Sequence, residues 1–364
     1  MRKFVGKLIS DNYNRTEAKF FSSSANRCQM TLQVALAGLY KPVDWADWDV
    51  SGVLPWSPVP YTIDDPMLRM YSVKECKNSD KVWKPIDDDT LPSLKEAKNR
   101  SAALLAYVGK ETGWNMSSLS RAADFADNLI EIELYNASYP EWVSHPTLEG
   151  YDEKKLVKEA LSFAEIHQIA CADYEPCRDL MSGVWLKHIL TTISDVQNGK
   201  GPQLAGYASH NEITLSVMKN LGIVKDELTT SAGFVLEFRM KPMPSVRLLA
   251  HDPNPIDKHV IYKAELIPEL ADKAAVDGFI SLEDFEAHIK SKASIFRLEE
   301  TLRDVERLHS RNSLNSKLHE ATKQCQHFFV ILNLCFSDYA FACALRFQKH
   351  RRFFFHFVLI CKVG

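Results

Sequence analysis

The sequence lacks any strong excess of charge of one sign. Its 44 Lys and Arg side chains nearly balance 47 Asp and Glu, which leaves a formal net charge of −3 and a pI near 6.5. Proteins that bind nucleic acid or an anionic membrane through their net charge carry a clear basic excess. We therefore expect no nucleic-acid partner.

The N-terminus lacks the apolar run of a secretory signal peptide. Residues 1–10 have a basic start, but no small-residue cleavage site follows them. Taken literally, this predicts a chain without a signal peptide. Sequons of the form Asn-x-Ser/Thr nevertheless occur at Asn14, Asn99, Asn115 and Asn136, and alone they are weak evidence of glycosylation.

The cysteines lack the paired spacing of a structural zinc site. Eight are present, but no Cys-x-x-Cys pair has a second such pair or a His-x-x-x-His partner to complete the four ligands. We therefore predict no metal and no cofactor. Cys171 and Cys177 can form a disulfide if the chain reaches an oxidising compartment.

A chain of 364 residues is long enough for one large domain or two smaller ones. Met30, Val34, Ala37 and Leu39 recur at helical spacing and predict the first helix. The same pattern predicts helices over residues 26–40, 92–108, 116–134, 153–169 and 181–196. Residues 41–89 are rich in Trp, Pro and Asp and predict a surface loop, because proline removes the donors of a strand ladder.

Strand patterns gather in the second half of the chain. A short apolar strand at 204–208 leads directly into a helix that ends at Gly222, where a left-handed C-terminal cap is expected. Residues 234–240 alternate apolar with other side chains, which predicts a strand with one buried face. Residues 246–249 and 260–262 are weaker strand candidates.

The last part of the chain changes character. Residues 328–347 form an apolar stretch interrupted by Asp338, and a basic run follows at 349–352. A membrane-spanning helix fits this pattern. However, a charge at mid-bilayer costs roughly 3 kcal/mol on insertion scales. The alternative is a non-native C-terminus that packs poorly.

One segment carries side chains suited to phosphate chemistry. His210 follows the predicted strand and directly precedes a helix, whose first N–H groups and dipole favour an anion. Glu212, two residues later, is placed to give a proton to a leaving alkoxide. From this segment alone, the opposing interpretation is that both side chains merely cap the helix.

Five stretches resemble, in the same order, motifs of one protein family. They lie at residues 21–40, 56–60, 136–142, 182–190 and 207–223. The last resembles the His-Asp-x-Thr-Leu signature of the histidine acid phosphatases, in their lysosomal and prostatic branch. The first is similar to that family's Arg-Ser-Thr-Asp-x-x-Arg-Thr-x-Met stretch. The resemblance covers about residues 5–290, and the tail matches nothing.

The resemblance implies an α/β fold of the phosphoglycerate mutase-like type. We expect a mostly parallel sheet flanked by helices, with an inserted helical cap subdomain at about residues 85–190. The phosphatase-like domain is predicted over residues 1–300 and the divergent tail over 301–364. The first strand and helix of the family's sheet are predicted to be missing.

The family's chemistry is only partly represented. In the family a His attacks phosphorus, arginines clamp the phosphoryl oxygens, a second His holds the phosphate, and an Asp protonates the leaving group. The Arg-His-Gly-x-Arg-x-Pro motif that supplies the attacking His occurs nowhere in the sequence. The further clamp arginine aligns with Phe21 and the acid with Asn211, whereas Arg27 is interpreted as structural. Loss of a covalent nucleophile typically costs on the order of 10⁶ in turnover.

Glu212 offers a substitute for the missing acid. The phytase branch of the superfamily uses His-Ala-Glu at this signature, with the Glu as proton donor, and His210-Asn211-Glu212 is similar to it. These three residues form the predicted catalytic set.

The leading hypothesis is therefore an acid phosphatase-like protein whose own activity is weak or lost. The alternative is a non-catalytic secreted or luminal pseudo-phosphatase that binds a small anion, so whether the chain is an enzyme is left open. The expected partner is a phosphate monoester or other small anion. A homodimer and a location outside the cell or in the lysosome are implied by the resemblance, and a membrane anchor through the tail is allowed.

Overall fold

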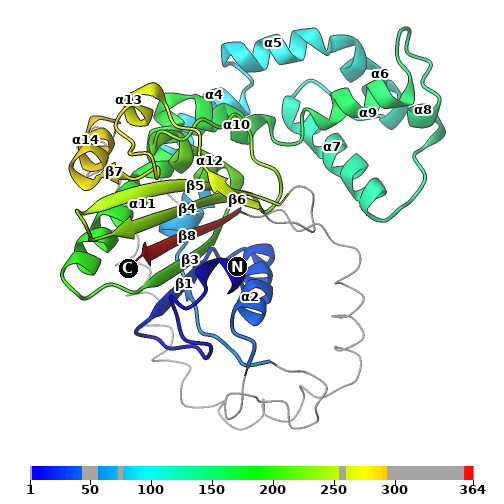
Figure 1. The fold of residues 1–364 in the computed structure, drawn as a ribbon. Coiled ribbons are helices and arrows are strands. Elements are labelled where there is room, and N and C mark those ends of the chain that lie inside the picture. Colours follow the sequence, from blue (N-terminus) through cyan, green and yellow to red (C-terminus); the bar gives the residue numbers. More distant parts are fainter. Residues whose placement is uncertain (1, 43–55, 73–76, 254–259, 293–355, 364) are drawn as a thin grey trace, which may run out of the picture. The chain divides into compact units, whose positions relative to one another are not determined.

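The computed structural model describes residues 2–42, 56–72, 77–253, 260–292 and 356–363. Its internal contacts divide the chain into two compact units, one of residues 1–84, 168–299 and 353–364, the other of residues 85–167 and 300–352. In the described residues the first unit holds a sheet with its helices, and the second is helical (Figure 1). The α/β class with a helical subdomain is confirmed, whereas the predicted domain limits stay predictions.

The first unit is built on a sheet whose strands run in the order β2-β1-β3-β8-β4-β5-β6, with β7 paired to β5. The C-terminal strand β8 thus lies between β3 and β4, far from its neighbours in sequence (Figure 1). The strands are β1 Ala18–Ser22, β2 Thr62–Ile63, β3 Leu204–Ser209, β4 Gly233–Arg239, β5 Ser245–Asp252, β6 Val260–Lys263, β7 Ile280–Ser281 and β8 His356–Val363.

The sheet is mixed rather than mostly parallel. Strand β1 pairs in parallel with β2 and β3, and β4 pairs in parallel with β8. Strand β8 runs antiparallel to β3, and β4, β5 and β6 form an antiparallel succession. Short connections between β4, β5 and β6 explain the antiparallel part, because parallel neighbours need a crossover of a dozen or more residues.

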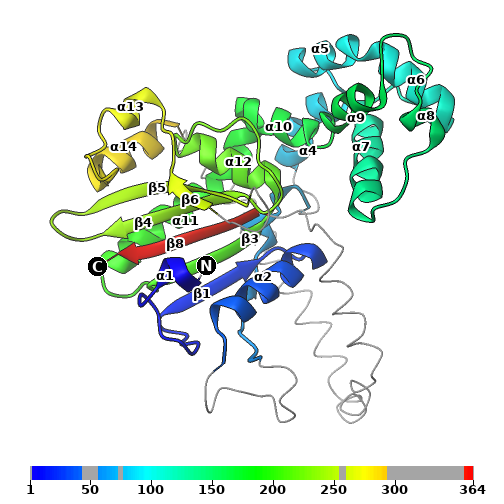
Figure 2. The same cartoon turned by 45° about the vertical axis from the view of Figure 1, so that its right-hand side comes forward.

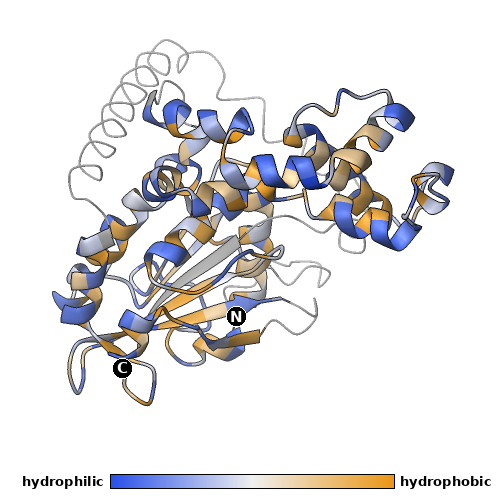
Figure 3. Ribbon diagram, turned by 90° about the horizontal axis from the view of Figure 1, so that it is seen from above, coloured by the Kyte–Doolittle hydropathy of each residue, from blue (hydrophilic) through white to orange (hydrophobic). Residues whose placement is uncertain are grey.

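Helices pack on both faces of this sheet. Helix α2 contacts β1 and β3 (Figure 2). Trp185 of α11 packs edge-on against Tyr207 of β3 at 4.7 Å between ring centres. Several strands of the sheet carry mostly hydrophobic colours in Figure 3. The helices of this unit are α1 Arg2–Val5, α2 Asn26–Leu39, α3 Asp65–Leu68, α4 Lys77–Asp87, α10 Ile166–Asp173, α11 Glu175–Gln197, α12 Asn211–Asn220, α13 Pro268–Ala271 and α14 Leu282–Lys292, with α4 and α10 crossing the unit limits.

Helix α2 is confirmed, but its buried face differs from the pattern that predicted it. Cys28, Leu32 and Leu36 are buried against the sheet, whereas Met30 and Val34 are 43% and 66% exposed. The two sets lie on different faces of the helix, since residues four apart share a face and residues two apart do not. Of the predicted set, Leu39 does face the core, whereas Met30 and Val34 do not.

Two further expectations were wrong in detail. Residues 41–89 are not loop throughout: they contain β2, α3 and the eleven-residue helix α4, which accommodates Pro85 in its last turn. Strand β4 is buried on both faces, since Val235 and Glu237 are buried as well as Phe234. The reason is that the sheet is covered on both faces: Val235 joins the core cluster that includes Leu32 and Leu36 of α2, and α12 also contacts β4. Arg247 pairs with the buried Glu237 carboxylate at 2.5 Å.

The second unit is an assembly of helices: α5 Pro92–Arg100, α6 Ala102–Thr112, α7 Leu119–Leu134, α8 Glu141–Ser144 and α9 Glu153–Leu161. Asp89 joins its parts, although its backbone has a positive φ of 52°. Its carboxylate accepts from the backbone N–H of Leu119 at 2.9 Å and lies 3.0 Å from Nε2 of His167. The buried carboxylate therefore also caps the start of α7.

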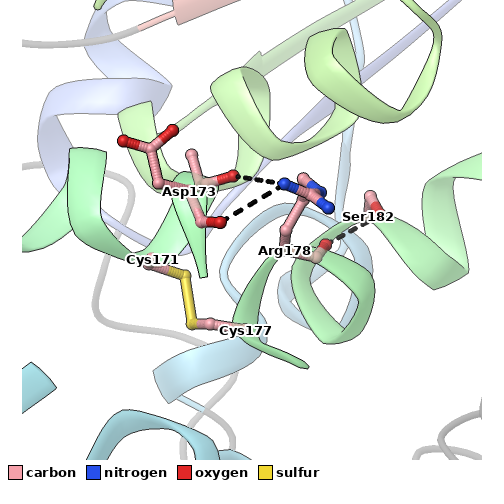
Figure 4. Close-up of a disulfide and its surroundings, with 6 residues drawn as sticks. Cys171, Asp173, Cys177, Arg178 and Ser182 are labelled. Atoms are coloured by element: carbon pink, nitrogen blue, oxygen red, sulfur yellow. Dashed lines mark hydrogen bonds between the residues drawn. A yellow bond between two sulfur atoms is a disulfide. The ribbon is translucent and has the colours of Figure 1, made fainter. Parts of the chain in front are cut away.

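The Cys171–Cys177 disulfide forms at the corner between α10 and α11 (Figure 4). Next to it, Arg178 donates to the backbone carbonyls of Ala172 and Asp173, which are left unpaired at the end of α10 (Figure 4). The bond and the arginine thus close the same turn.

The predicted tail lies outside the described residues from 301 to 355. Its last part, β8, is a strand of the sheet. Among the described residues, no helix combines the length and apolar character that crossing a membrane requires.

Candidate functional site

The site is built at the junction of β3 and α12, as the sequence predicted. Strand β3 is buried along its whole length and ends at Ser209, and α12 begins at Asn211. His210 is the N-cap residue of the helix, with extended backbone dihedrals. At the other end, Gly222 has a φ of +82° and closes the helix, as predicted.

His210 is only 3% exposed and is held from two sides. Its Nδ1 lies 3.0 Å from a terminal nitrogen of Arg27, in the first turn of α2. Its Nε2 lies 2.9 Å from the hydroxyl of Ser23, just after β1. The thiol of Cys28 is a further neighbour, with Sγ 3.6 Å from Nε2.

These partners define the protonation of the imidazole ring. A guanidinium can only donate, so Nδ1 of His210 must accept the hydrogen bond from Arg27. The ring proton is then on Nε2, which donates to the Ser23 hydroxyl. In this arrangement the Nδ1 lone pair is already engaged and Nε2 has none to offer.

Glu212, in the first turn of α12, is a buried carboxyl. Burial raises its pKa above the ordinary 4.5, because the charged form is poorly solvated there. A backbone N–H of the helix, the Tyr71 hydroxyl and the charges of Arg27 and Arg69 act in the opposite direction but do not outweigh burial. The carboxyl therefore keeps its proton to higher pH than an exposed glutamic acid does.

Tyr71 lies between these groups. Its ring packs edge-on against the His210 imidazole at 5.7 Å between centres, and its hydroxyl hydrogen-bonds to Glu212. Burial and the adjacent carboxyl raise the pKa of the phenol, so it stays protonated. Among the residues that the structure describes, no group of three or more His, Cys, Asp or Glu side chains is arranged to hold a metal ion.

Comparison with curated proteins finds acid phosphatases. The protein named "Putative acid phosphatase 5" of Caenorhabditis elegans is 23% identical over 235 residues, which cover 62% of this chain and 51% of that protein. The lysosomal acid phosphatase of Homo sapiens is 22% identical over 233 residues, which cover 62% of this chain and 52% of that protein. The lysosomal acid phosphatase of Rattus norvegicus is 20% identical over 229 residues, which cover 61% of this chain and 51% of that protein. The chain is thus similar to acid phosphatases, at low identity.

The chain spans about half the length of these histidine acid phosphatase relatives. No family model matches it. Among solved structures, the apo phytase of Hafnia alvei has a TM-score of 0.49 at 13% identity. The match covers 80% of this chain and 83% of the phytase chain. The phytase of Citrobacter braakii has the same TM-score at 14% identity and the same coverage. Both likenesses are remote.

Two positions where the sequence departs from the family's motifs are now placed. Asn211 is buried as the first residue of α12, beside His210 and Glu212, so the three predicted catalytic residues lie together. Phe21, at the position of the clamp arginine, stacks on the ring of Tyr207 with 5.1 Å between centres. It therefore contributes an apolar contact there, not a cation.

Sequence reasoning missed three members of the site. Arg27, interpreted as structural, bonds directly to His210. Arg69 and Tyr71 were assigned to a loop without function, although both act on Glu212. In the sequence, Arg69 and Tyr71 merely follow the apolar pair Met67 and Leu68. This pattern does not distinguish them from ordinary surface residues.

Proposed function

We propose that this chain is an acid phosphatase-like protein that binds a phosphate monoester or inorganic phosphate at the start of α12. The observation that carries the proposal is the Arg27–His210–Ser23 arrangement at the N-terminus of a ten-residue helix. Helix N-termini and guanidinium groups both favour phosphate oxygens. Arg27 is exposed, so its remaining N–H groups are accessible to an anion.

Weak or absent hydrolysis is the second half of the proposal. A phosphohistidine intermediate requires a ring nitrogen with a free lone pair to attack phosphorus. In His210 the Nδ1 lone pair accepts from Arg27 and Nε2 carries the proton. This argues against His210 as the group that attacks phosphorus and leaves the anion to Arg27 and the helix N-terminus, which His210 helps to position.

Glu212 supports residual activity rather than an inert site. If a water oxygen attacks phosphorus, the ester P–O bond breaks and the water releases a proton, which stays on the phosphate product or returns to the acid. The departing alkoxide takes a proton. Glu212, protonated to a higher pH than usual, is placed to supply it, whereas the Asn211 amide is not acidic. Such a reaction without a covalent nucleophile is expected to be slower by up to about 10⁶ than that of a complete enzyme.

A luminal setting also fits the chain. Two of the relatives are named lysosomal acid phosphatases, and the Cys171–Cys177 disulfide is typical of proteins that mature in an oxidising compartment. We therefore propose a lysosomal or extracellular glycoprotein. The alternative is a non-catalytic pseudo-phosphatase in the same compartment, which shares the anion site and differs only in turnover. The predicted homodimer and membrane anchor stay predictions.

The test combines binding with turnover on the full chain. We expect titration calorimetry to detect inorganic phosphate binding at pH 5, and His210→Ala to weaken it at least about tenfold. His145→Ala, which removes an exposed imidazole in the other unit, is the control and should bind as the parent does. Turnover of p-nitrophenyl phosphate then separates the two alternatives. Absence of phosphate binding by the folded parent chain would refute the proposal.

A further inference from the structure

Arg69 brings a second guanidinium group to the His210 site from a separate segment. It is the C-cap residue of α3, and its side chain lies over the ring of Tyr71 at 5.8 Å from the ring centre. It also donates to the Tyr71 hydroxyl. The Nε of Arg69 is fully buried and, within the described part of the chain, has no hydrogen-bond partner.

Tyr71 connects this guanidinium to the rest of the site. Its hydroxyl accepts from Arg69 and hydrogen-bonds to the Glu212 carboxyl, while its ring packs edge-on against His210. Tyr71 is therefore the residue through which Arg69 contacts the His210 and Glu212 end of the site.

The charges of the site do not balance. In the ranges that the structure describes, neither Arg27 nor Arg69 forms an ion pair with a carboxylate. Burial raises the pKa of Glu212, which further reduces the negative charge near them. Both guanidinium groups act electrostatically on Glu212, in the first turn of α12. Neighbouring cations repel each other unless an anion or solvent screens them.

We propose that Arg69 is the second guanidinium of an oxyanion-binding site, with Arg27 the first and Tyr71 the residue that positions it. This rests on the proposed function and adds two binding residues to it. A tetrahedral oxyanion such as phosphate has enough oxygens for both guanidinium groups and for the backbone N–H groups of α12. Arg69 lies outside the stretches that resemble the family's motifs, so it supplies a cation independently of the position that Phe21 occupies.

The experiment is calorimetric titration of the full chain with inorganic phosphate at pH 5. Arg69→Gln is expected to weaken binding roughly ten- to a hundredfold, the range of a lost charge-assisted hydrogen bond. Arg69→Lys keeps the charge but not the bidentate geometry, so its phosphate affinity should lie between those of the parent and of Arg69→Gln. Arg121→Gln removes an exposed guanidinium in the other unit and should leave the affinity unchanged.

Tyr71 is tested by its coupling to Arg69. Tyr71→Phe keeps the ring against His210 and removes only the hydroxyl, so it should weaken phosphate binding less than Arg69→Gln does. In the double variant the two losses should not add, because each removes the same oriented guanidinium. A Tyr71 that served packing alone would give additive or no effects on affinity.

The outcomes separate this inference from the proposed function. If His210→Ala abolishes binding while Arg69→Gln and Arg69→Lys bind within twofold of the parent, Arg69 is no part of the site and only this inference fails. If the folded parent does not bind phosphate at all, both fail. If Arg69→Gln does not fold, Arg69→Met, which keeps the length of the side chain and removes its charge, decides: parent-like phosphate affinity in that variant overturns the inference.

Discussion

A terminal nitrogen of Arg27 lies 3.0 Å from Nδ1 of His210, although the two residues are 183 positions apart in sequence. The contact joins the start of α2 to the start of α12 across the end of β3. It also decides which ring nitrogen of His210 is protonated, and hence what the imidazole can do. A residue that looked structural is thereby the one that sets the chemistry of the site.

Replacing Arg27 with Gln should release the Nδ1 lone pair of His210. A glutamine loses the charge and reaches less far, so the imidazole is free to take up a proton on Nδ1. Nitrogen-15 NMR of the ring is expected to show a mixture of tautomers or an imidazolium in the variant at pH 6, and one Nε2–H tautomer in the parent. A ring already mixed in the parent would contradict the bond from Arg27.

Glu212 should make the folded chain less stable as the pH rises. Its folded-state pKa is raised, so between the ordinary value of 4.5 and the raised value the folded chain binds more protons than the unfolded one. Stability is therefore lost with rising pH through that window. Glu212→Gln should remove this loss of stability. In urea melts, the stability of the variant relative to the parent should therefore be greater at pH 8 than at pH 4. Glu149→Gln, on an exposed carboxyl, is the control and should show no such trend.

His188 should make the folded chain less stable as the pH falls, the opposite of the effect of Glu212. Its Nε2 lies 2.6 Å from the Tyr207 hydroxyl, and burial, aided by Lys19, lowers its pKa from 6.5 to about 4. The unfolded chain takes up a proton below pH 6.5 and the folded chain does not until about pH 4, so stability falls as the pH falls through that window. The loss is at most about 3 kcal/mol. His188→Gln should flatten the melting temperature between pH 6.5 and 4, whereas a parallel decline in both proteins would assign the effect elsewhere.

The β3–α12 junction could be predicted from sequence because local patterns fix it. An apolar strand, a polar N-cap residue and a glycine at the C-terminal end are all set within residues 204–222. Arg69 and Tyr71 could not be predicted, because their role depends on a contact with residues far away in sequence. The buried face of α2 was also missed, since Cys28 counts as a weak hydrophobe while Met30 and Val34 count as strong ones. Both faces of β4 are buried because helices distant in sequence cover the sheet, which no local window contains.

The Cys171–Cys177 disulfide closes a short loop, with a sequence separation of 6. Loop-closure entropy for so short a loop predicts a stabilisation of about 2 kcal/mol. Changing both cysteines to Ser should lower the free energy of unfolding by that amount under oxidising conditions. The same variant should be insensitive to dithiothreitol, which destabilises the parent. Equal melting temperatures for the parent with and without the reductant would show that the bond does not form.

Strand β8 makes the sheet continuous, because it alone joins β3 to β4 in the described strands. Leu359 pairs with Gly206 on one side and Val235 on the other, at the middle of both ladders. Leu359→Pro removes a backbone donor at this point and should destabilise the first unit by about 3 kcal/mol or more. Leu359→Ala keeps the N–H and serves as the control. Because the open edges of β3 and β4 would then be exposed to other chains, the proline variant should also aggregate, as followed by light scattering. A proline variant that melts like the alanine control and stays monomeric would place β8 outside the sheet.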